Sequence, residues 1–227
     1  MAAALGWGAL AASSLVIGAL IGLARPWPRQ ATGLVLGFGA GALISAVSFE
    51  LAEEGVRLAG ALPVAIGLGV GAITYYLASI KVASMGGGSA LALGAFLDGI
   101  PEQMVLGIGL AGGASVSAGL LAAIFVSNLP EAIGGATDML RQTHARGQVI
   151  RNWVLIASAC AFATIVGYAI ADTASDEFQG GINGFAAGAL LVMLVDSMIP
   201  EATEQAGRTT GLVTALGFAV AAGLSFA

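Results

Sequence analysis

Long apolar segments separated by short polar breaks constrain this chain more than any other feature. Its mean hydropathy is +0.94, and only 9% of its residues are charged, which is rare in soluble globular proteins. About 20 consecutive apolar residues predict a membrane-spanning helix, because hydrocarbon cannot satisfy free backbone groups. This criterion predicts eight spans, at residues 3–24, 30–53, 59–80, 88–111, 116–140, 149–171, 181–203 and 209–226. We therefore expect an all-α integral membrane protein with a single transmembrane domain over residues 1–227.

The basic residues predict which loops face the cytoplasm. Seven of the eight lie in loops that share one side, namely Arg25, Arg29, Lys81, Arg141, Arg146, Arg151 and Arg208, and only Arg57 lies on the other. Because lysine and arginine accumulate in cytoplasmic loops, both termini are expected outside the cytoplasm. The first 24 residues have no basic N-terminal region, so we interpret them as a span and not as a cleaved signal peptide. We expect a multi-pass protein of the cell (inner or plasma) membrane.

Two internal repeats predict a pseudo-symmetric arrangement of the spans. The segment from Gly37 matches the segment from Gly184, with identical pairs that include Gly41/Gly188 and Glu54/Glu201. These segments lie in spans of opposite direction, which is typical of the inverted repeats of secondary transporters. A second repeat relates spans 88–111 and 116–140, through the pairs Phe96/Phe125, Pro101/Pro130 and Glu102/Glu131. We expect three helices, a central pair and three further helices, a 3+2+3 inverted-repeat arrangement.

Acidic residues lie where the central pair of spans crosses the middle of the bilayer. Asp98 and Glu102 share one helical face, and Asn128 and Glu131 share another. A charged carboxylate there costs about 2.5–3.5 kcal/mol, and no basic residue lies in the middle of a span. Protons or a bound cation must offset the charge, and this set of oxygen ligands suits a divalent cation. The simpler alternative is a structural kink at each Pro-Glu pair with a protonated glutamate.

Further polar residues mark a route to and from this site. Ser127 adds a hydroxyl beside Asn128. The other residues assigned to the route are Glu50, Glu53 and Glu54 near the outer end of span 30–53, and Asp196 and Glu201 near the inner end of span 181–203. For Glu53, Glu54 and Glu201, ordinary solvation at a helix end is the simpler explanation.

At these residues the chain resembles the ZIP (Zrt/Irt-like) family of metal transporters. The fourth helix of that family typically reads His-Asn-x-Pro-Glu. Here Pro101 and Glu102 match, while Asp98 occupies the histidine position and Gly99 the asparagine position. The resemblance implies eight helices with outside termini, a three-two-three inverted plan, and a metal site between helices 4 and 5.

Other spans carry weaker parts of the resemblance. In span 116–140, Asn128, Pro130 and Glu131 match the similar motif of the family's fifth helix, with Ser127 in the histidine position. Span 181–203 ends on Ile199-Pro200-Glu201-Ala202, which looks like the family's seventh helix. The spans contain no histidine. Zinc prefers nitrogen and sulfur ligands, so an all-oxygen site shifts the expected metal toward manganese, ferrous iron or magnesium.

We therefore expect a secondary transporter that brings a divalent metal ion into the cytoplasm. Zinc is implied by the resemblance, and manganese or iron by the oxygen ligands. Asp98, Glu102, Asn128 and Glu131 would bind the ion, Glu50 would receive it, and Asp196 with Glu201 would release it. The metal is a substrate, and we expect no permanently bound cofactor and no enzymatic activity.

The expected partners are few, and three other functions stay open. The lipid bilayer is the main partner, a homodimer is left open, and nucleic acid is excluded because the net charge is −5 with no basic patch. The alternatives are a proton-coupled carrier of a small organic solute, a metal-binding homologue that does not transport, and an intramembrane hydrolase. The hydrolase is least favoured, because the chain lacks the histidines and the Gly-x-Gly-Asp stretch that such enzymes need.

Overall fold

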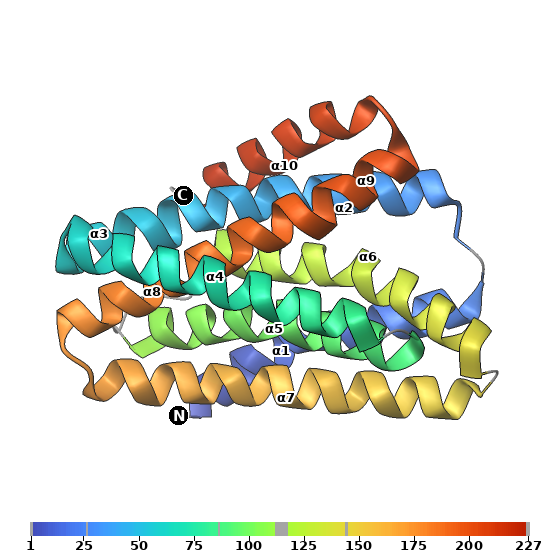
Figure 1. The fold of residues 1–227 in the computed structure, drawn as a ribbon, viewed down its shortest axis with the longest axis horizontal. Helices are drawn as coiled ribbons and strands as arrows, with labels where there is room; N and C mark the ends of the chain where they lie inside the picture. The colour runs from blue at the N-terminus through green and yellow to red at the C-terminus, as the bar shows by residue number, and fades with distance from the viewer. Residues whose placement is uncertain (1, 26, 86, 112–117, 144, 226–227) are drawn as a thin grey trace.

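The computed structural model describes the chain except residues 1, 26, 86, 112–117, 144, 226 and 227. Side chains at positions 85, 87–95, 98, 118, 138, 143, 172 and 173 are also outside the description. Within the described part, the chain forms eight continuous helical rods and no strand, which confirms the all-α prediction (Figure 1).

Six of the rods consist of one α-helix each. They are α1 (Ala2–Ala24), α4 (Ala61–Met85), α5 (Gly87–Ala111), α6 (Ala118–Thr143), α7 (Arg146–Thr173) and α10 (Thr209–Ser225). The other two rods contain a π-helical segment between two α-helices. One runs through α2 (Arg29–Ser45), η1 (Ala46–Glu53) and α3 (Glu54–Ala59), and the other through α8 (Asp176–Met193), η2 (Leu194–Met198) and α9 (Ile199–Ala206).

The two composite rods continue past the predicted span ends and stop at glycines. Gly60 has a φ of 81° and Gly207 a φ of 65°, and these are the two glycines with positive φ in the described part. Each donates its N–H to a carbonyl of the last turn, Gly60 to Val56 O at 2.8 Å and Gly207 to Thr203 O at 2.9 Å. Glycine is suited to this conformation because it has no Cβ.

The distribution of side chains is that of a multi-pass membrane protein. In the described part, six helices are long and apolar enough to cross a membrane, and Thr209–Ser225 is a shorter apolar helix. Large apolar side chains point outward, as Leu62 and Leu212 do at 72% and 77% exposure. Polar side chains such as Glu102 are buried. Lipid rather than water is the solvent that suits this surface.

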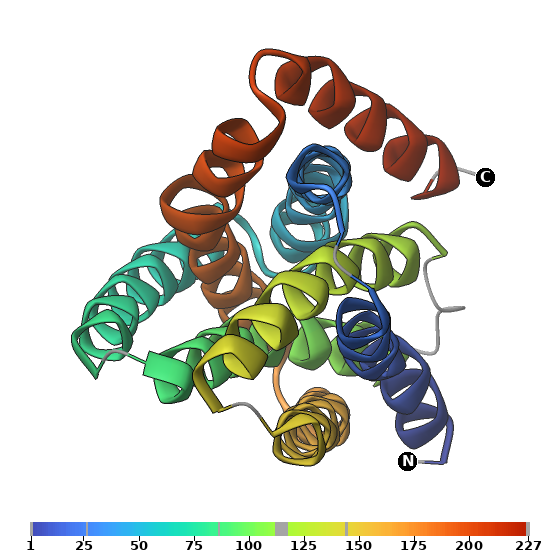
Figure 2. The same ribbon diagram turned by 90° about the vertical axis from the view of Figure 1, so that its right-hand side faces the viewer.

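Close contacts between helices depend on glycines. A Cβ at Gly41 would overlap the carbonyl of Thr214, so α2 lies tightly against α10. A Cβ at Gly188 would overlap the carbonyl of Leu68, so α8 lies in the same way against α4. The view along the rods shows α5 and α6, in green and yellow-green, at the centre between α4 and α1 (Figure 2). The core therefore surrounds the pair of helices that carries both Pro-Glu motifs.

Candidate functional site

The central pair of helices brings polar groups into the interior of an apolar bundle. α5 and α6 each contain an internal proline, Pro101 and Pro130, and they contact each other. Proline has no backbone N–H, so the carbonyls of Leu97 and Val126 lose their usual partner four residues ahead. Each helix therefore offers a free backbone acceptor close to its Pro-Glu motif.

Glu102 is the buried carboxyl group of this pair. Its side chain is 1% exposed, and its Oε1 accepts a hydrogen bond from Ser127 Oγ of α6 at 3.3 Å. The Ser127 hydroxyl also lies 3.1 Å from the carbonyl of Ile124 in its own helix. The Ser127 hydroxyl has one proton and two acceptors within reach. It can therefore break its hydrogen bond to Glu102 and still donate to Ile124 O. The structure thus brings together the carboxyl of one Pro-Glu helix and the hydroxyl of the other.

Asn128 adds an amide with spare hydrogen-bonding capacity. It is 1% exposed, and its Nδ2 has no hydrogen-bond partner among the described residues. Buried polar groups are normally satisfied, so this amide has hydrogen-bonding capacity that a substrate or its water could use. A half-turn of the side-chain amide would exchange Nδ2 for Oδ1 and present an oxygen ligand in the same place.

The structure says less about the other two predicted ligands, Glu131 and Asp98. Glu131 is half-buried on α6, one turn beyond Asn128. Asp98 lies on α5, but its side chain is outside the described part of the chain. Among the described side chains, no group of three or more His, Cys, Asp or Glu could hold a metal ion. The described residues therefore provide part of the predicted cage, centred on Glu102, Ser127 and Asn128.

Three acidic residues assigned to the entry of the route lie in the second half of the first composite rod: Glu50, Glu53 and Glu54. Glu50 is half-buried within η1, and Glu53 is exposed at its last position. Glu54 forms an ion pair with Arg57, whose Nε lies 2.7 Å from Glu54 Oε2. This pairing agrees with an ordinary role for Glu54 at a solvated helix end.

The inner acidic residues face different neighbours. Glu201 is exposed, and its Oε1 accepts a hydrogen bond from Gln205 Nε2 at 2.9 Å. That oxygen also lies 4.0 Å from the position that a Cβ would take at Gly134 of α6, one turn beyond Glu131. Glu201 thus faces the central helix that carries Glu131.

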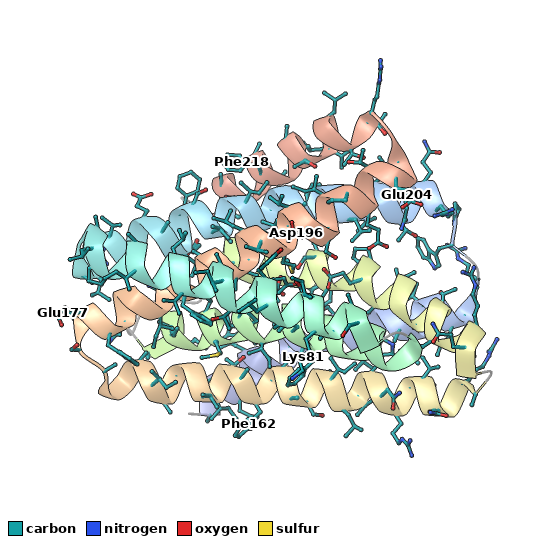
Figure 3. The ribbon with its side chains drawn as sticks, viewed as in Figure 1. Lys81, Phe162, Glu177, Asp196, Glu204 and Phe218 are labelled. Atoms are coloured by element: carbon teal, nitrogen blue, oxygen red, sulfur yellow. The ribbon has the colours of Figure 1, made fainter. Side chains whose placement is uncertain are left out.

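Asp196 faces away from the central pair. It lies in η2 and lines a groove of about 530 Å³ between α4 and α8. The rest of that groove is formed mainly by apolar residues: Leu68, Ala72, Ile73, Tyr76, Gly188, Leu191, Val192 and Val195. Figure 3 shows Asp196 about halfway along the bundle. Asp196 therefore lies on the face of its rod that is turned toward α4.

A second buried polar pair was missed by the sequence reasoning. Thr164 Oγ1 of α7 donates to Gln103 Oε1 of α5 at 2.6 Å, and both side chains are 0% exposed. Gly8 of α1 packs directly on Thr164. A glutamine beside Glu102 in the middle of a span was the available signal, but its partner is 61 residues away. The pair ties α5 to α7 on the side away from Ser127.

Comparison with models of protein families and with curated proteins finds no match for this chain. What the site does must therefore be argued from its own geometry.

Proposed function

We propose that this chain is a secondary transporter that moves a divalent metal cation into the cytoplasm through a site between α5 and α6. The observation that carries the proposal is the burial of Glu102, together with Ser127 and Asn128, at the contact of two proline-containing helices. An ionisable group in such a place is by default functional, because its burial is costly. Asp98, Glu102, Asn128 and Glu131 are the proposed ligands.

The charge on these residues favours a cation as the substrate. A divalent ion would offset the buried carboxylates, and protons would replace it when the site is empty. Oxygen ligands of this kind favour manganese, ferrous iron or magnesium, while zinc would bind with less preference.

An inverted repeat is the proposed basis of movement, and three paired features support it. The close contacts of Gly41 with α10 and of Gly188 with α4 involve residues that are equivalent in the sequence repeat. The positive-φ caps Gly60 and Gly207 are separated by the same interval in the sequence. Both composite rods also contain a π-helical segment after a similar length of α-helix. In repeats of this type, one bundle rocks against the other around a central site.

Membership of the ZIP family and the route through the protein are parts of the same proposal. Eight helical rods, with a Pro-Glu motif in the fourth and in the fifth, agree with the resemblance seen in the sequence. On this route Glu50, with Glu53 and Glu54 around it, receives the ion, and Glu201 with Asp196 releases it. Glu201 is the best-placed exit residue because its carboxylate faces α6.

Uptake of radiolabelled manganese, iron and zinc into vesicles containing the purified protein tests this function. We expect Glu102→Ala and Glu131→Ala to abolish uptake while insertion and folding are kept, and Glu102→Gln to behave in the same way because it removes only the charge. Glu204→Gln is the matched control, since that carboxylate is exposed and pairs with Arg29 at 3.0 Å. Wild-type uptake in either alanine variant would refute the assignment.

A proton-coupled carrier of a small organic solute is the second candidate. It is favoured by the finding that the described side chains contain no cluster of three metal-binding residues. The two functions differ in how they respond to metal. Stabilisation of the purified protein against heat by manganese, iron or zinc supports metal transport, whereas a proton gradient that drives solute uptake with no metal effect supports the carrier.

A further inference from the structure

Two π-helical segments interrupt the α-helical rods in the described part of the molecule. η1 covers eight residues and η2 five, and each interrupts a rod that is otherwise α-helical. Both begin in the same way: the N–H of Ala46 is shared between Ala42 O and Leu43 O, and that of Leu194 between Leu190 O and Leu191 O. π-helical turns are rare and are found frequently at functional sites.

One local feature at each segment weakens the α-helical hydrogen-bond pattern. In η1, Ser48 Oγ donates to Ile44 O at 2.8 Å, and this carbonyl is the one that the Ser48 N–H would use in an α-helix. In η2, Pro200 has no N–H to donate to the carbonyl of Asp196 four residues earlier. Each segment thus has, in it or beside it, one side chain that competes with or removes an α-helical hydrogen bond.

The segments lie next to the proposed site. Met198, the last residue of η2, is 2% exposed, and its Cε would meet a Cβ at Gly39 at 3.0 Å. The same Cβ would lie 2.9 Å from Ser127 Cα, so Met198 and Ser127 converge on Gly39. η1 in turn contacts α6 and α8. A change in either segment would therefore be felt at α6, the helix that carries Ser127 and Glu131.

Both segments also carry acidic residues of the proposed route. Glu50 lies half-buried in η1, and Asp196 lies in η2 on the groove between α4 and α8. A π turn holds one residue more than the α turn that it replaces. When it moves along a rod past a residue, that residue rotates by about 100° about the helix axis. Such a rotation would turn Asp196 away from the groove between α4 and α8 and toward the side of the rod on which Met198 now lies.

We propose that η1 and η2 are the moving elements of the transport cycle, in which each π turn migrates along its rod and swings Glu50 and Asp196 toward the site between α5 and α6. The role of η1 and η2 in transport rests on the proposed function. The way in which they would move is inferred from the geometry of the two rods. Movement of two equivalent segments in opposite halves would open the site alternately to the two sides of the membrane.

Two substitutions that favour the α-helical form test the inference. Ser48→Ala frees the carbonyl of Ile44, and Pro200→Ala restores an N–H. Ser158→Ala is the matched control, because Ser158 Oγ makes the same bond, to Val154 O at 2.7 Å, within the regular helix α7. In wild-type protein we expect amides 46–53 and 194–198 to exchange with deuterium faster than those of the flanking helices.

The double variant Ser48→Ala/Pro200→Ala should slow that exchange by about fivefold. It should lower uptake of radiolabelled manganese by about tenfold while manganese affinity changes by less than about twofold, because the ligands are untouched. Ser158→Ala should change none of these. Slow wild-type exchange in both segments, or full uptake in a double variant with slowed exchange, would overturn the inference. If the wild type takes up no metal, the proposed function fails, and the exchange measurement still decides whether the segments move.

Discussion

At the scale of single residues, the interior of this molecule shows how few polar groups an apolar bundle tolerates and how specifically they are placed. Glu102 and Gln103 are neighbours in α5 but point to different helices, one to Ser127 of α6 and the other to Thr164 of α7. The Gln103 Nε2 is buried and has no hydrogen-bond partner among the described residues. The Thr164 hydroxyl is thus the hydrogen-bond partner that the structure gives the Gln103 side chain.

This arrangement predicts a coupled effect of two substitutions. Thr164→Val keeps the shape of the side chain but leaves the Gln103 amide buried without that bond, so we expect the free energy of unfolding to fall by about 1 kcal/mol. Adding Gln103→Leu removes the buried amide and should restore most of the loss. Unfolding in detergent micelles measures both changes.

The matched control for this pair is Thr203→Val. Thr203 is exposed, and its hydroxyl bonds to Ile199 O of its own helix at 2.8 Å, so its loss should change stability by less than about 0.5 kcal/mol. If Thr164→Val is as mild as this control, or if Gln103→Leu adds to the loss, the proposed coupling is absent.

At the scale of the helices, close packing rests on glycines at equivalent positions of the two composite rods. Gly41 lies against α10 and Gly188 against α4, with no room for a methyl group. Gly41→Ala and Gly188→Ala should each lower the free energy of unfolding by about 1–3 kcal/mol, because the helices must move apart. Equal losses are expected if the two halves share one packing geometry. Thermal unfolding in micelles checks this.

Gly69→Ala is the control for these glycine variants. Gly69 lies in α4, and a Cβ there would have nothing within 4 Å, so alanine should be neutral or stabilising through its better helix propensity. If Gly41→Ala and Gly188→Ala are as stable as Gly69→Ala, the tight contacts do not form.

The helices were also where prediction from the sequence succeeded most. The run of apolar residues fixes where each rod must lie, and Pro101 and Pro130 mark the central pair because proline and glutamate are rare inside spans. The direction of a side chain around its rod was harder to predict. Sequence reasoning assumes about 100° per residue throughout, and a π turn breaks that rule. For this reason the direction in which Asp196 of η2 points was not anticipated. The Thr164–Gln103 bond was missed because long-range pairs leave no local signal.

At the scale of the whole molecule, the two ends of the bundle differ in how many basic residues they carry. The turn between α1 and α2 and the turn between α9 and α10 lie at one end, and both chain termini are marked toward the other (Figure 1). Arg25, Arg29 and Arg208 belong to the first end. The opposite end carries Asp176 and Glu177 at the start of α8. Since bilayers retain basic residues on the cytoplasmic side, we expect the end with Arg25, Arg29 and Arg208 to face the cytoplasm.

The orientation can be measured with reporter fusions in a bacterial inner membrane. Alkaline phosphatase is active only outside the cytoplasm, and green fluorescent protein placed there by the secretion pathway does not fluoresce. A phosphatase fused after Ala227 should be active, and one fused after Arg208 should be inactive, with the fluorescent reporter giving the opposite pattern. The Arg208 fusion is the internal control, because one helix, α10, separates the two sites. Fluorescence from the Ala227 fusion would place the termini in the cytoplasm, and import through the route from Glu50 to Glu201 would then become export.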